Sequence, residues 1–150
     1  MATLPSVNLV AVLGAAIASM VIGAIWYSPN MFGKKWMKLT MKMQMPKGAS
    51  KKAIAQMKEQ MQKSMMKGYA LTFVTTLITA YVLAVLARLI GATTVMGGAE
   101  IGFLAWFGFV ATNSLGGYIW ENDPIDMYFL KAGFTLVSLV VMGAIVAFWI

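Results

Sequence analysis

The sequence predicts an all-α integral membrane protein, a four-helix bundle with one or two amphipathic interfacial helices in the first loop. Hydrophobic residues make up 60% of the 150 positions, and charged residues only 11%. Four apolar runs approach or exceed 18 residues, and a helix needs about 20 residues to cross a ~30 Å hydrocarbon core. Ten of the twelve basic residues lie between Lys34 and Lys67. Because lipid offers backbone groups no hydrogen-bonding partner, each apolar run is expected to be helical.

We expect a single domain over the whole chain. The expected spans are residues 7–26, 68–90, 99–120 and 128–150, and residues 29–67 form an amphipathic segment between the first two. The first run contains Ala16-Ile17-Ala18, which is similar to a signal-peptidase site. No Lys or Arg precedes this run, however, and its apolar character continues to Trp26, so we interpret it as a retained first span.

Charge predicts the orientation. Short loops rich in Lys and Arg resist translocation, so the lysine-rich segment after the first span is expected in the cytoplasm. Both termini and the connection Gly91–Gly98 are then expected outside. The expected location is a cell membrane, of prokaryotic type.

The first part of this loop is predicted to be an amphipathic helix. Ser28 suits an N-cap and Pro29 the first helical position. Trp26 and Tyr27 belong at the membrane interface. Apolar side chains then recur at helical spacing, at Phe32, Trp36, Leu39 and Met43. Lysines occupy the opposite face, which is typical of an interfacial helix that attracts anionic lipid.

The second part of the loop is predicted to be another helix that runs directly into the second span, with Gly68 as a weak joint between them. Ser50 is its expected cap, and Glu59 and Lys63 form a favourable pair four residues apart. Its apolar stripe consists of Ile54, Met57, Met61 and Met65. A methionine stripe is usually packing surface, and methionine also favours adaptable partner-binding surfaces.

Copper binding is a further hypothesis for this loop. Met41, Met43 and Met45 would place three thioethers on one side of an extended chain, and soft sulfur ligands select Cu(I). The neighbouring lysines repel a cation, and the chain has no Cys or His to complete such a site. We therefore expect no metal and no other cofactor.

Polar and small residues in the other spans predict helix contacts. Asn113 is expected to bond to another helix, because an unpaired amide is costly in lipid. Its use by a ligand is the alternative. Small residues every four positions predict close helix packing, at Ala11, Ala15, Ser19 and Gly23 in the first span and at Gly108, Thr112 and Gly116 in the third.

The third loop is acidic, and we expect it to dock on the basic first loop through Glu121 and Asp126. Lys131 follows this loop in the fourth span. Its side chain is expected either to reach the inner membrane surface or to meet one of the loop's carboxylates.

The chain resembles a family of small four-span membrane proteins that is catalogued only as a domain of unknown function. The resemblance covers nearly the whole chain and rests on Trp26-Tyr27-Ser28-Pro29, Phe32-Gly33-Lys34, Trp36, Gly102, Trp106, Gly108-Phe109-Val110-Ala111-Thr112, Tyr118-Ile119-Trp120-Glu121, Pro124, Ala132-Gly133-Phe134 and Met142-Gly143-Ala144-Ile145. It implies a four-helix fold and a membrane location, with no established reaction. The methionine- and lysine-rich part of the first loop departs from the family pattern.

Three functions follow as hypotheses. The first is a structural or accessory component that binds other membrane subunits, itself or anionic lipid. The second is a small oligomeric transporter or channel with the threonines of the second span facing inward. The third is an intramembrane enzyme, which is not expected because the chain has five acids, no His or Cys, and no Ser beside a recognisable base. Nucleic-acid binding is disfavoured because the lysines face a membrane.

Overall fold

The structure is a computed structural model that describes residues 4–44 and 48–149. Its elements are α1 (Leu9–Trp26), α2 (Gly33–Gln44), α3 (Lys51–Ile90), α4 (Val95–Ala105), the π-helical turn η1 (Trp106–Ala111), α5 (Thr112–Trp120) and α6 (Ile125–Phe148). Four helical stretches are long and apolar enough to cross a membrane: α1, α3, α6 and the continuous stretch from α4 through α5. The all-α class and the four membrane-length helices are therefore as predicted.

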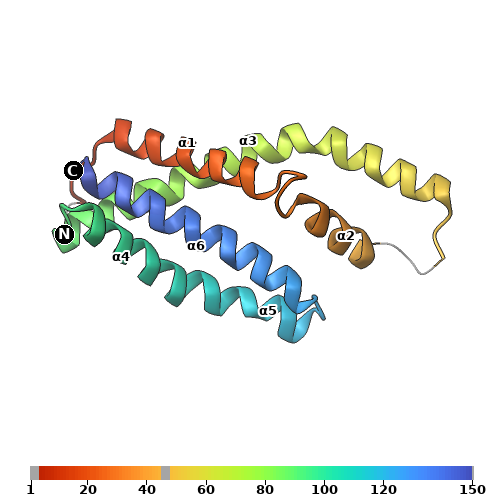
Figure 1. Ribbon diagram of the computed structural model, residues 1–150. Coiled ribbons are helices and arrows are strands. Elements are labelled where there is room, and N and C mark those ends of the chain that lie inside the picture. Colours follow the sequence, from red (N-terminus) through yellow and green to blue (C-terminus); the bar gives the residue numbers. More distant parts are fainter. Residues whose placement is uncertain (1–3, 45–47, 150) are drawn as a thin grey trace.

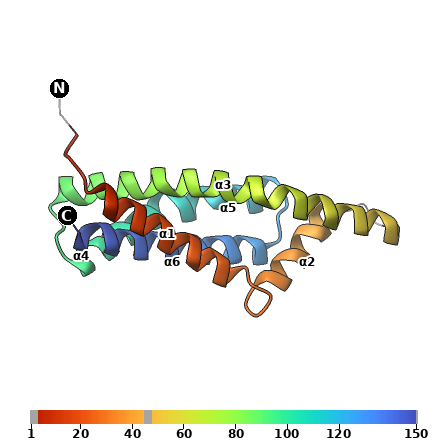
Figure 2. The same ribbon diagram turned by 90° about the horizontal axis from the view of Figure 1, so that it is seen from above.

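Helix α6 lies at the centre of the arrangement. It packs against α1 on one side and α4 on the other, while α3 crosses behind and contacts α1, α6 and α4 (Figure 1). The start of α1 and the end of α6 lie at one end of the molecule. Helix α2 and the first half of α3 lie at the opposite end, as the view from above also shows (Figure 2). The lysine-rich segment is thus separated from the termini by the length of the packed helices.

The closest helix contact joins α4 to α6. A Cβ atom on Gly98 would overlap the carbonyl of Gly143, and one on Gly102 would overlap the carbonyl of Leu139. The two backbones therefore touch directly, as small residues permit in membrane helices. Trp106 continues this face four residues after Gly102.

The small-residue prediction was right for the first span and wrong for the third. Ala11, Ala15 and Ser19 are buried in α1. In the third span, a Cβ atom on Gly108 or Gly116 would have nothing within 4 Å, so neither residue is at a helix contact. The face that meets α6 runs through Gly98, Gly102 and Trp106, and Gly108 is two positions further on, which turns it away from this face.

Helix α3 is continuous over 40 residues. At about 1.5 Å per residue it is ~60 Å long, about twice the hydrocarbon thickness. The backbone N–H of Ala53 donates to the Ser50 hydroxyl at 3.3 Å, and Lys63 pairs with Glu59 at 2.8 Å. The predicted cap, ion pair and direct run into the second span are all present. The first turns of α3 extend beyond the ends of α1, α5 and α6, and α2 lies at the same end of the molecule (Figure 1).

Candidate functional site

The segment that follows α1 is a closed turn. The backbone N–H of Phe32 donates to the Trp26 carbonyl at 3.0 Å, and that of Gly33 donates to the Ser28 carbonyl at 2.9 Å. A Cβ atom on Gly33 would overlap the carbonyl of Tyr27, so this turn requires glycine there. Helix α2 therefore begins at Gly33, and the prediction of a start at Ser28 and Pro29 was wrong. Ser28 uses its backbone carbonyl to close the turn.

Aromatic side chains hold this turn against α6. The rings of Trp26 and Phe32 lie 4.7 Å apart between centroids. Tyr27 meets Trp36 edge-on at 5.8 Å and Phe134 edge-on at 5.4 Å. Burial raises the pKa of the Tyr27 phenol above its ordinary value of 10.0, so this side chain stays neutral at physiological pH. The cluster joins α1, α2 and α6.

Two tryptophans donate to neighbouring backbone carbonyls of α6. The Nε1–H of Trp26 donates to Leu130 at 3.2 Å, and that of Trp106 donates to Ala132 at 2.9 Å. The Trp26 ring also lies over Gly133, where an added Cβ would be 3.1 Å from its Cζ2 atom. These bonds fix α1 and η1 to the same turn of α6.

An ion pair links α2 to the start of α6. Lys35 Nζ lies 3.1 Å from Asp126 Oδ1, and the two side chains are 52% and 58% exposed. Asp126 lies in the first turn of α6, where a negative charge also favours the helix. The acidic third loop thus meets the basic first loop through Asp126. Glu121 is exposed at the end of α5 and has no ion pair within residues 4–44 and 48–149.

A cavity of about 180 Å³ lies between α2 and α6. Its lining residues are Trp36, Thr40 and Met43 of α2 and Met127 and Lys131 of α6. Among the described residues Lys131 has no carboxylate partner, so of its two expected arrangements the pairing with the third loop is not formed. The cavity therefore combines a cation and a hydroxyl with apolar walls.

The structure gathers most of the predicted site residues at this junction. They are Trp26, Tyr27, Ser28, Pro29, Phe32, Gly33, Trp36 and Asp126. Thr40 and Met127 were missed, although their spacing from Trp36 and Lys131, four residues in each case, places them on the same helix faces.

The remaining predicted residues lie elsewhere. Asn113 is exposed on α5, and its amide shows no bond to another helix in the described part of the chain. Trp120 is 84% exposed. Met41 and Met43 belong to helix α2, so the extended arrangement assumed for copper is not formed there. Met45 lies outside the described residues.

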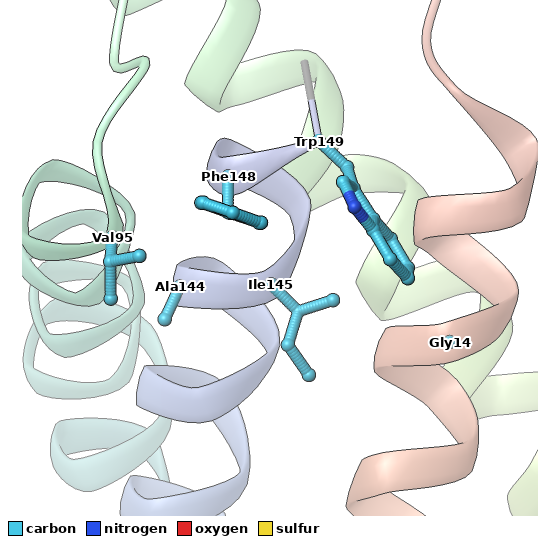
Figure 3. A pocket seen from close by; sticks show the side chains of 6 residues that line it. All are labelled: Gly14, Val95, Ala144, Ile145, Phe148 and Trp149. Atoms are coloured by element: carbon cyan, nitrogen blue, oxygen red, sulfur yellow. The ribbon is translucent and has the colours of Figure 1, made fainter.

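A second cavity, of about 300 Å³, lies at the opposite end of α6. It is lined by Gly14, Val95, Ala144, Ile145, Phe148 and Trp149, and the Trp149 ring reaches from α6 towards α1 beside Gly14 (Figure 3). Its side chains are apolar apart from the indole N–H of Trp149. This cavity therefore offers no charged group for chemistry or for anion binding.

Comparison with known proteins identifies one family that matches most of the chain. The family model described as "Protein of unknown function (DUF1761)" matches residues 10–147. No curated protein and no solved structure matched the chain.

Proposed function

We propose that this chain, which belongs to the DUF1761 family of proteins of unknown function, is a membrane-embedded accessory component that binds an acidic partner protein. The binding surface is the basic first part of α3, residues 51–67, called here the α3 extension. The observation that carries the proposal is the unbroken course of α3 from Lys51 to Ile90. A helix of this length presents lysines beyond the membrane on a rigid support.

The orientation is part of the proposal. Lysines are concentrated at the end of the molecule opposite the termini, which favours a cytoplasmic α3 extension with both termini outside. The membrane is proposed to be a prokaryotic cell membrane. Helix α2 would lie at its inner surface, with Trp36 and Leu39 half-buried and lysines such as Lys38 exposed.

The distance of each lysine from the membrane indicates whether the α3 extension binds a partner protein or the surrounding lipid. If Lys67 marks the membrane surface, Lys58 lies about 13 Å and Lys52 about 22 Å beyond it at 1.5 Å per residue. The Debye length at physiological ionic strength is about 8 Å. Lipid beneath the helix therefore attracts Lys67 strongly and Lys52 hardly at all. An acidic protein in the cytoplasm, in contrast, can contact the lysines along the whole α3 extension.

The side chains of the α3 extension suit such a contact. Its one acid, Glu59, is paired with Lys63, which leaves the other lysines available. Met65 and Met66 are 47% and 79% exposed. Flexible methionine side chains adapt to different partner surfaces, so the extension combines charge attraction with apolar contact.

The transporter alternative has less support. The hydroxyl of Thr75 donates to the Thr72 carbonyl at 2.9 Å, and that of Thr79 donates to the Thr75 carbonyl at 3.0 Å. These hydroxyls are satisfied within their own helix. They therefore require no water-filled path between subunits.

In-cell photo-crosslinking tests the proposal. A photoreactive amino acid at Gln60, which is exposed on the α3 extension, should give an adduct with a specific protein. The same probe at Leu13, exposed on α1, should label lipid and is the matched control. Reversing two charges, Lys52→Glu and Lys58→Glu, should abolish the Gln60 adduct and leave the thermal midpoint unchanged. An adduct that survives charge reversal, or labelling of lipid alone at Gln60, would contradict the proposal.

A further inference from the structure

The cavity between α2 and α6 lies beside two tryptophans, Trp26 and Trp36. Lys131 directly follows Leu130, whose carbonyl accepts the Trp26 indole N–H. Trp36 forms one wall of the cavity. Indole rings with a polar edge concentrate where hydrocarbon meets headgroups. The cavity is therefore at the depth of the lipid phosphates, provided that the proposed membrane placement holds.

Lys131 is the charged side chain among the residues that line the cavity. Lys35 and Asp126 neutralise each other at 3.1 Å. Lys131 has no carboxylate partner in the described ranges, and its ammonium carries three hydrogen-bond donors. Thr40 contributes a hydroxyl to the same cavity. Together these groups match a single anion with several acceptor oxygens.

The walls and the size specify the rest of the ligand. Trp36, Met43 and Met127 are apolar apart from the indole N–H of Trp36, which disfavours a fully hydrated small anion. A volume of about 180 Å³ is below that of a typical small-molecule pocket, so it accommodates a fragment only. A phosphodiester and its glycerol fit this combination, with the acyl chains remaining in the surrounding lipid.

We propose that this cavity binds the headgroup of one anionic phospholipid. The phosphate contacts Lys131 and Thr40, and the glycerol carbons lie against Trp36 and the two methionines. This site goes beyond the proposed contact with a protein partner and shares only the membrane placement with it. The aromatic cluster and the Lys35–Asp126 pair hold α2 against α6 and so form the wall of the site.

Native mass spectrometry of the full chain in a nonionic detergent tests the site. The probes are phosphatidylglycerol and phosphatidylcholine with identical acyl chains. The wild type should retain one phosphatidylglycerol more tightly than further copies. It should also retain it more tightly than phosphatidylcholine, because the choline cation neutralises that headgroup and is repelled by Lys131. Lys131→Gln should weaken the first binding step about tenfold, because it removes a charge-assisted hydrogen bond.

Three variants and one competitor make the result decisive. Lys131→Arg should retain most of the affinity, and Thr40→Val should lose about threefold. Lys38→Gln, on the opposite face of α2, is the matched control and should bind as the wild type does. Equal losses from Lys38→Gln and Lys131→Gln, or no preference between the two lipids, would overturn the site.

Displacement by inorganic phosphate beyond that caused by sodium chloride of equal ionic strength would point to a soluble anion instead and would also overturn it. None of these measurements reports on the crosslink at Gln60, so the two proposals can fail separately.

Discussion

The indole N–H of Trp26 donates to the backbone carbonyl of Leu130 at 3.2 Å, so the last residue of α1 is fixed to α6 beside the cavity between α2 and α6. Trp26→Phe removes the donor and keeps most of the ring. We expect it to lower the free energy of unfolding by about 1 kcal/mol, the usual net worth of one hydrogen bond. Thermal unfolding in detergent, followed by circular dichroism, measures this loss. Trp120→Phe, at an exposed indole, is the control and should change nothing; equal effects at both positions would show that the bond from Trp26 to Leu130 does not stabilise the fold.

The contact between α4 and α6 predicts a sharp difference among glycines of the third span. Gly102→Ala places a methyl group on the Leu139 carbonyl, so the helices must separate. We expect a loss of about 3 kcal/mol or failure to fold, at the upper end of overpacking costs. Gly108→Ala meets open space and should be neutral or slightly stabilising, since alanine is the better helix former. The folded fraction after detergent extraction distinguishes them, and a similar response from both would show that the packing is wrong.

The pair formed by Lys35 and Asp126 should contribute little, because both side chains are about half exposed. A double-mutant cycle with Lys35→Ala and Asp126→Ala should give a coupling energy of about 0.5 kcal/mol that decreases with added salt. Asp126→Ala should cost more than Lys35→Ala, since it also removes a negative charge from the first turn of α6. A coupling of zero at low salt would indicate that α2 does not hold this position.

The turn after α1 gives a further prediction. Gly33→Ala forces a methyl group against the Tyr27 carbonyl, so the turn must open and α2 must leave α6. We expect the first phosphatidylglycerol to bind at least tenfold more weakly, because Trp36 and Thr40 then no longer face Lys131. The same native mass spectrometry measures this affinity. Gly116→Ala, where nothing lies within 4 Å, is the control; unchanged lipid binding in Gly33→Ala would contradict the site.

The parts of the fold that depend on local sequence could be predicted. The helix ends at Trp26 and Ile90, the Ser50 cap and the Glu59–Lys63 pair all follow from residues within four positions of one another. The continuous α3 also follows, because no proline interrupts it and a single glycine does not break a helix.

The remaining features depend on contacts between distant segments. The sequence offers several small-residue stripes in the third span, and only the position of α6 selects Gly98 and Gly102 over Gly108. The Ser28-Pro29 pair suits a helix start locally, but the turn closed through Gly33 replaces it. The candidate cavity lies between α2 and α6, which are about 90 residues apart in the chain. The periodicity of either helix alone therefore cannot predict it.

The depth of the α3 extension relative to the membrane is the most direct test of a cytoplasmic, partner-binding helix. The chain has no cysteine, so Gln56→Cys, Gln60→Cys and Ser64→Cys each accept a single spin label. In liposomes, relaxation by a water-soluble nickel complex and by oxygen reports how far each label lies from the hydrocarbon. We predict that all three lie in water, and that the distance from the membrane grows by about 6 Å per step of four residues towards Gln56. Equal, shallow depths at the three positions would show a helix lying on the membrane and would contradict the proposed partner-binding extension.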